Sequence, residues 1–155
     1  MNSRLRNMLG AILLGVCGCE FLQAETGREA WLRYAPLDEV GHAKYAGIPA
    51  SAIAVGDSAV IRTAQQELVR GLRGMLGRVL REGKELPQEN AIVLDTFDVI
   101  HEAIPDLRPP SELKTDGFWL TSAKARGHEF LVITATNDRG VLYGVFSPIH
   151  VETGA

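Results

Sequence analysis

One long amphipathic run constrains the fold of this chain more than any other feature. Residues 58–83, SAVIRTAQQELVRGLRGMLGRVLREG, carry apolar side chains at spacings of three and four, the repeat of one face of an α-helix. Asp57 or Ser58 can cap the start of this helix by accepting from free N–H groups, and Gly83 can close its end. The predicted buried stripe comprises Ile61, Ala64, Leu68, Leu72, Met75, Leu76 and Val79.

Three glycines, Gly71, Gly74 and Gly77, interrupt the predicted helix. Each costs roughly 1 kcal/mol relative to alanine in a helix interior, so another feature should offset them. Either a second backbone or a sugar approaches the helix closely, or the glycines permit tight packing on a sheet or are simply tolerated; we favour the second explanation. A phosphate-binding loop is not indicated, because the glycines do not lie between a strand and a helix.

Short strands are predicted on both sides of this helix. EAWLRYAPL at 29–37 alternates apolar and polar side chains until Pro36, and ASAIAV at 50–55 is a second apolar run, ended by Gly56 and Asp57. NAIVLDT at 90–96 has the composition of a buried strand.

The last third of the chain predicts a hairpin and a final helix. After a short helical or irregular excursion at 97–110, the runs DGFWLTSA and HEFLVITATN are joined by KARG, whose glycine is typical of a hairpin turn. Residues 138–146 follow an Asn-Asp cap and predict a helix with Val141, Leu142, Val145 and Phe146 on its apolar face. This order predicts an α+β fold, a two-layer α/β sandwich in which helices cover one face of a mixed sheet.

The first 24 residues have the pattern of a signal peptide. Arg4 and Arg6 precede the apolar run MLGAILLGVCGC, and FLQA offers cleavage after Ala24. An alternative is a lipoprotein signal, in which Cys19 carries an acyl anchor. Both signals predict an exported protein, periplasmic or extracellular. The two cysteines, Cys17 and Cys19, lie in this segment, so we expect the mature domain to have neither a disulfide nor a thiolate metal site.

The balance of charge argues against a nucleic-acid partner. The chain has 155 residues and a net charge of -3, with 16 Lys and Arg spread among 19 Asp and Glu. Such a distribution offers no basic stripe for a phosphate backbone. The length suits one globular domain.

Few residues form a pattern that indicates catalysis. A glycosidase needs two carboxylates about 5 to 9.5 Å apart, and the candidates are Asp95, Asp98 and Glu102 near one strand end and Asp138 at the last helix. We expect them to be solvated acids rather than a catalytic pair. Asp138 and Arg139 can also form a helix cap and a surface ion pair, or a buried network that reaches a ligand.

Other chemistries find little support in the residues. The histidines show no metal-ligand spacing, and no Gly-x-Ser-x-Gly motif is present. We therefore predict no catalytic residue, no metal and no cofactor, and we name no substrate-binding residue. Trp31 and Trp119 can stack on sugars, but their strand positions favour the core. The four histidines are His42, His101, His128 and His150.

Two segments resemble a known family. GREAWLRYAPL and DGFWLTSAKARGHEFLVITATNDRGVLYGVF are similar to the N-terminal domain of the α-glucuronidases of glycoside hydrolase family 67, over about residues 27–146. The resemblance implies a sandwich like the domain that precedes the barrel in β-hexosaminidases. It also implies a catalytic (β/α)8 barrel that this chain lacks, so no catalytic residue is carried over. The enzyme family removes 4-O-methylglucuronic acid from xylan-derived oligosaccharides.

The resemblance predicts three segments: a signal peptide over 1–24, a domain over 25–146 and an atypical tail over 147–155. Because Ser147-Pro148 disfavours helix where the family continues it, we interpret the tail as the product of a frameshift, truncation or gene fragment. The expected function is that of a non-catalytic domain of an exported α-glucuronidase, whose partners are the barrel and glucuronic-acid-bearing xylo-oligosaccharides. The alternative is a free-standing carbohydrate-binding or interaction domain, and exposure of the barrel-facing surface would favour self-association.

Overall fold

The structure, a computed structural model, describes residues 34–110 and 113–147. Within these ranges no helix is both long enough and apolar enough to cross a membrane. Several predictions concern other parts of the chain and lie outside the described residues, namely the signal peptide over 1–24 with Cys17 and Cys19, Trp31, His150 and the tail beyond Ser147.

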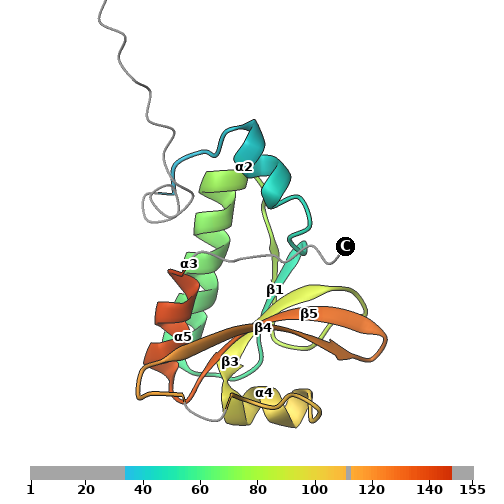
Figure 1. The fold of residues 1–155 in the computed structure, drawn as a ribbon, viewed down its shortest axis with the longest axis vertical. Coiled ribbons are helices and arrows are strands. Elements are labelled where there is room, and N and C mark those ends of the chain that lie inside the picture. Colours follow the sequence, from blue (N-terminus) through green and yellow to red (C-terminus); the bar gives the residue numbers. More distant parts are fainter. Residues whose placement is uncertain (1–33, 111–112, 148–155) are drawn as a thin grey trace, which may run out of the picture.

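A mixed sheet of five strands forms the centre of the described domain, in the order β2-β1-β3-β5-β4 (Figure 1). Neighbouring strands run parallel from β2 to β5, and β4 pairs antiparallel with β5. The predicted α+β class is confirmed, as are the strands at 50–55 and 90–96 and the hairpin. The strands are β1 (Ser51–Ala54), β2 (Arg81–Gly83), β3 (Ala91–Thr96), β4 (Phe118–Ala125) and β5 (His128–Ala135).

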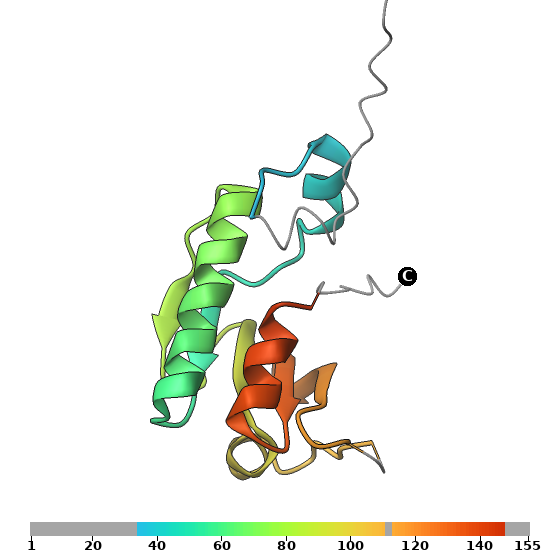
Figure 2. The ribbon, with the colours of Figure 1, turned by 90° about the vertical axis from the view of Figure 1, so that its left-hand side faces the viewer.

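Two helices, α3 (Ala59–Leu76) and α5 (Asp138–Val145), lie side by side against one face of the sheet (Figure 2). They make the helical layer of the predicted sandwich. The short α4 (Phe97–Ala103) packs on the other face through the buried Ile100. The segment predicted at 97–110 as short helical or irregular structure therefore covers a small part of the second face of the sheet.

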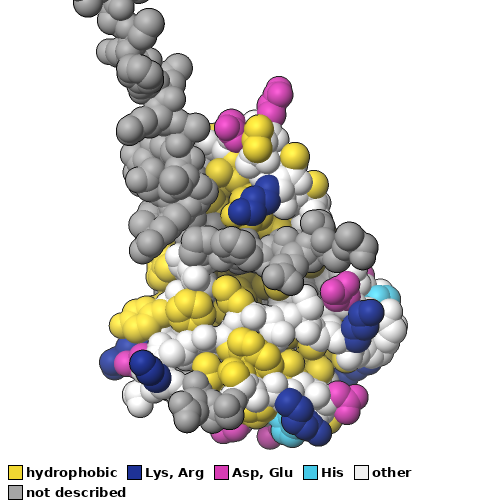
Figure 3. Space-filling view, viewed as in Figure 1, with side chains coloured by type: hydrophobic (Ala, Val, Ile, Leu, Met, Phe, Trp, Pro, Cys, Tyr) yellow, Lys and Arg dark blue, Asp and Glu magenta, His cyan; other side chains and the backbone are white. Residues whose placement is uncertain are grey.

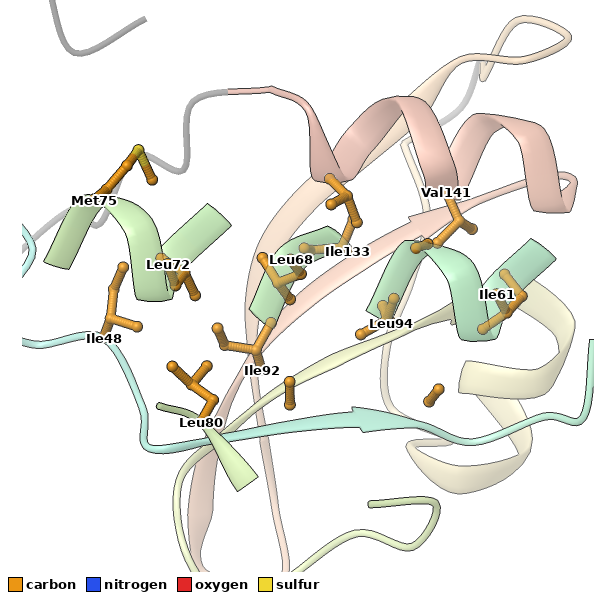
Figure 4. Packing of buried hydrophobic residues seen from close by; sticks show 14 of the residues in the cluster. Ile48, Ile61, Leu68, Leu72, Met75, Leu80, Ile92, Leu94, Ile133 and Val141 are labelled. Carbon is orange, nitrogen blue, oxygen red and sulfur yellow. The ribbon is translucent and has the colours of Figure 1, made fainter. Parts of the chain in front are cut away.

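The core follows from the alternation of side chains along each strand. On β3, Ile92 and Leu94 point to α3 and α5, whereas Val93 points to the opposite face, and all three are fully buried. Figure 4 shows Leu68 and Leu72 of α3 directed at Ile92 of β3. Because β3 is central and buried on both faces, its run is continuously apolar.

The long helix ends earlier than its hydrophobic pattern predicts. Ser58 caps α3 as expected, accepting from the N–H of Val60. Gly77, however, ends the helix in the left-handed conformation, with φ 64°. Val79 is consequently 69% exposed and not part of the buried stripe. Gly83 is not a cap but belongs to β2, which pairs in parallel with β1.

The strand predicted at 29–37 is wrong over its described part. Tyr34 has φ 52°, and residues 35–37 have no strand pairing. The backbone N–H of Leu37 instead donates to the Met75 carbonyl at 3.0 Å, which ties this segment to the end of α3. A Cβ atom at Gly74 would lie 2.6 Å from the Tyr34 carbonyl oxygen, and one at Gly71 would lie 2.8 Å from the Tyr34 ring. The favoured explanation is therefore wrong for Gly71 and Gly74, because a second stretch of backbone and its tyrosine ring, rather than the sheet, approach the helix at these glycines.

Two further helical features differ from the sequence prediction. The segment that we expected to be a polar connection contains α2 (Glu39–Lys44), which begins where Asp38 accepts from the N–H of Gly41 at 2.8 Å. In α5, Val141 and Val145 are buried as predicted, but Leu142 is only partly buried. Phe146 is the C-cap and is 37% exposed, whereas Gly140 and Gly144 lie close to Ala135 and Ile133 of β5.

Candidate functional site

The carboxyl ends of the parallel strands β1, β3 and β5 meet at one edge of the sheet. This is the position at which α/β sheets commonly bind ligands. Residues 55–58 follow β1, Asp95 and Thr96 end β3, and residues 136–138 follow β5. The candidate site therefore includes two of the carboxylates that the sequence singles out, Asp95 and Asp138.

Asp95 is a buried acceptor for two loops. Its side chain is 2% exposed, and its two oxygens accept from the backbone N–H of Gly56 at 2.7 Å and of Thr96 at 2.8 Å. Burial raises the pKa of Asp95 above its ordinary value, and the nearby Asp138 acts in the same direction, while the two N–H donors partly oppose this change. The carboxylate thus holds the β1–α3 loop against the end of β3.

Asp138 is joined to the same loop by a side-chain hydrogen bond. The Ser58 hydroxyl, which also caps α3, donates to the Asp138 carboxylate. The neighbouring Asp57 is exposed and forms an ion pair with Lys84 at 2.6 Å, which lowers the pKa of Asp57. The starts of α3 and α5 are therefore linked directly at the sheet edge.

A second group of polar contacts fixes the start of α5. Asn137, rather than Asp138, is its N-cap and accepts from the N–H of Gly140 at 2.9 Å. The Asn137 amide donates to Asp116 at 2.9 Å, and Arg139 lies 3.4 Å from the same carboxylate. The cap expected at Asn137 and Asp138 is made by Asn137 alone, and Arg139 forms its surface ion pair with Asp116 and not with Asp138.

The predicted carboxylate cluster at the end of β3 is divided by burial. Asp95 is buried, so the expectation of a solvated acid is wrong for this residue, whereas Asp98 and Glu102 are exposed on α4 as expected. Within the described ranges, no three or more His, Cys, Asp and Glu side chains are grouped to hold a metal ion. His101 stacks on Phe97 with ring centroids 5.4 Å apart, which is a packing role.

An open pocket of about 280 Å³ lies beside this edge, between the start of α4 and the residue after β5. Its described lining contains one carboxylate, that of Asp98, whereas glycoside hydrolysis needs a pair. Trp119 is partly buried and packs against the core of the second face, in agreement with the structural interpretation of this residue. The described lining consists of Phe97, Asp98, Pro109, Pro110, Leu113 and Thr136.

The polar groups at this edge of the sheet mostly form hydrogen bonds with one another. Asp95 is closed to solvent and holds two backbone donors, while Asp138 accepts from Ser58. These hydrogen bonds connect the ends of strands to the starts of helices, so the role of this edge is structural. Sequence analysis missed the contributions of Gly56 and Asp116. Their positions after β1 and before β4 are the signal that could have indicated them.

Comparison with known proteins gives consistent similarities. The chain matches the family described as "Glycosyl hydrolase family 67 N-terminus" over residues 30–147. It is 35% identical to an alpha-glucuronidase of Hypocrea jecorina over 130 residues, which are 79% of this chain and 15% of the relative. It is also 35% identical to alpha-glucuronidase A of Emericella nidulans over 146 residues, 90% of this chain and 16% of the relative. The chain thus spans about one sixth of the length of these relatives.

Proposed function

Because the chain belongs to the family "Glycosyl hydrolase family 67 N-terminus", we propose that it is the non-catalytic N-terminal domain of an exported α-glucuronidase that acts in glucuronoxylan breakdown. The observation that carries this proposal is the match between nearly the whole described domain and about one sixth of each α-glucuronidase relative. Five sixths of such an enzyme is enough for a catalytic barrel, which takes about 250 residues. The partner of this domain is then that barrel.

The sheet edge supports a non-catalytic role. A catalytic carboxylate must reach the substrate, but Asp95 is buried and bound to two backbone N–H groups. Asp138 is held by the hydroxyl of Ser58. Two of the four carboxylates that the sequence offers as glycosidase candidates, Asp95 and Asp138, are therefore used to join elements of the domain.

Export is proposed from the sequence of residues 1–24 alone. A basic start, an apolar run and the small residue Ala24 favour cleavage after position 24, and a lipid anchor on Cys19 is the alternative. The mass of the mature N-terminus in a secreting bacterial host distinguishes these outcomes. A chain that keeps Met1 and stays in the cytoplasm would contradict export.

The experiment that tests the proposed function is complementation. The chain is co-expressed with the part of the Hypocrea jecorina α-glucuronidase that follows its matched segment, and release of glucuronic acid from xylo-oligosaccharides is measured. We expect no release by the chain alone and a higher yield of soluble, active enzyme when the two pieces are made together. An equal yield of active enzyme without the chain would contradict the proposal.

The alternative function has its own outcome in this experiment. A free-standing carbohydrate-binding domain would bind glucuronic-acid-bearing xylo-oligosaccharides by itself and leave the yield of the co-expressed piece unchanged. Calorimetric titration of the purified chain with these oligosaccharides measures that binding. The proposed function predicts no heat of binding.

A further inference from the structure

We propose that Phe118, Tyr143 and Phe146 form the surface against which the catalytic domain of the enzyme packs. We call these three residues the aromatic surface. The inference rests on the proposed function and extends it by assigning the face of the domain that meets its partner.

The aromatic surface stands out among the exposed side chains. Six large hydrophobic residues of the described chain are exposed, and the three aromatic ones all belong to α5, its C-cap or the start of β4. Their exposed fractions are 37% for Phe118, 49% for Tyr143 and 37% for Phe146. Figure 3 shows hydrophobic side chains gathered over this part of the molecule. Aromatic residues are enriched in protein interfaces, where they supply large apolar contact areas.

The packing of α5 explains why these side chains face outward. Gly140 and Gly144 lie against the sheet, where a Cβ atom at Gly144 would be 2.8 Å from Ile133 and 3.2 Å from Phe118. The helix therefore approaches the sheet closely through its small residues, and Phe118 lies directly beside it. Tyr143 and Phe146 occupy the remaining sides of the last turn and its C-cap, away from the core.

The position of the family boundary identifies the occupant. The family match ends at residue 147, immediately after Phe146, and each relative extends far beyond its matched segment, so we infer that the rest of the enzyme follows from a point next to the aromatic surface. That following part makes up most of each relative, since the matched segment is 15 to 16% of the total. We therefore assign the surface to the catalytic domain rather than to a second copy of this chain.

The test uses the co-expressed complex with the remaining part of the Hypocrea jecorina enzyme. The double variant Tyr143→Ser/Phe146→Ser removes both exposed rings of the helix end. The matched control is Val40→Ser/Val79→Ser, because these side chains are 79% and 69% exposed and lie elsewhere on the domain. Circular dichroism and the melting temperature of each purified chain show whether it is folded. If the double variant is unfolded, the single variant Tyr143→Glu is used in its place.

We expect the aromatic double variant to weaken the complex by roughly thirtyfold or more, as for the loss of interface hot spots. The valine control should bind like the wild type. If both variants bind like the wild type, the surface assignment is wrong and the proposed function stands. If the wild-type chain itself forms no complex, the proposed function fails.

Two other results would overturn the assignment of the occupant. Size-exclusion chromatography of the chain alone could reveal a dimer that the aromatic variant dissociates while the complex stays intact, which would assign the surface to a second copy. Loss of xylo-oligosaccharide binding in the aromatic variant, again with the complex intact, would instead assign the surface to sugar.

Discussion

At the scale of single residues, the buried Asp95 carboxylate makes stability depend on pH. Its folded pKa is raised mainly by burial, so between the ordinary value of 3.8 and the folded value the folded state holds more protons than the unfolded state. The contribution of Asp95 to stability therefore decreases as pH rises through this window and is constant above it. We expect the Asp95→Asn variant to lack this decrease.

Urea unfolding of both proteins over the acid range measures this effect. The free energy of unfolding of the wild type minus that of Asp95→Asn should fall with rising pH. At every pH, the wild type should also be more stable than the variant by a further constant amount of about 1 to 3 kcal/mol. The reason is that the asparagine side chain of the variant presents an NH2 group to one of the two backbone N–H groups, which then has no acceptor. Asp98→Asn controls for the loss of a negative charge in solvent. A difference that rises with pH would refute this account of Asp95.

The turn of the β4–β5 hairpin contains a residue that is poorly suited to its backbone. Arg126 and Gly127 connect the strands with φ 52° and 81°, and a two-residue turn of the I′ type requires positive φ at both positions. We expect Arg126→Asn to stabilise the domain by about 1 kcal/mol, the lower end of the cost of a non-glycine residue in this conformation. Thermal unfolding measures the gain. Lys124→Asn, within β4, should bring none, and a gain in both variants would refute the turn as the cause.

The candidate site was predictable in its residue types but not in its connections. Asp95 and Asp138 are visible in the sequence as carboxylates near predicted element ends. Their partners Gly56 and Ser58 come from 39 and 80 positions away in the chain, respectively. Such pairings depend on the order of strands in the sheet, which local patterns do not reveal. The sequence therefore indicates where polar groups gather but not that they bind one another.

At the scale of elements, the glycines of α3 make a testable contact with the chain at Tyr34. Alanine at position 74 would place its Cβ atom 2.6 Å from the Tyr34 carbonyl oxygen and 3.0 Å from its Cβ. Because backbone cannot move aside as a flexible side chain can, we expect Gly74→Ala to destabilise the domain by about 1 to 3 kcal/mol. Helix propensity alone predicts the opposite, a gain of about 1 kcal/mol.

Urea unfolding decides between these two signs. Gln66→Ala, at an exposed position of the same helix, is the matched control and should change stability little. A stabilised Gly74→Ala variant would mean that the Tyr34 segment does not pack on α3 in solution.

Elements with a complete local pattern were predicted well. β1, β3, the hairpin and the starts of α3 and α5 each have their own apolar repeat, turn or cap. The end of α3 was not predictable in this way, because Val79 continues the helical spacing beyond Gly77. What decides the structure there is the parallel pairing of β2 with β1, in which Arg81 lies opposite Ser51. The short α2 escaped prediction because none of its residues is buried, so it has no apolar stripe.

At the scale of the whole molecule, one sheet supports two apolar clusters. The larger lies between the sheet and the helices α3 and α5, and the smaller lies between the sheet and α4. Neighbouring residues of β3, such as Ile92 and Val93, belong to different clusters. Neither cluster can lose its strands without opening the other, so the domain should unfold as one unit.

This expectation is tested by one substitution in each cluster. Leu72→Ala removes a fully buried side chain from the α3 face, and Phe130→Ala removes one from the second face. We expect losses of about 2 to 5 kcal/mol for each, with both substitutions shifting the same transition. Urea titration is followed by far-ultraviolet circular dichroism and by tryptophan fluorescence, and the two signals should coincide in the wild type and in both variants. If Phe130→Ala moved only the fluorescence transition, the second face would be an independent unit, and α4 would be an appendage of the sandwich rather than part of its cooperative core.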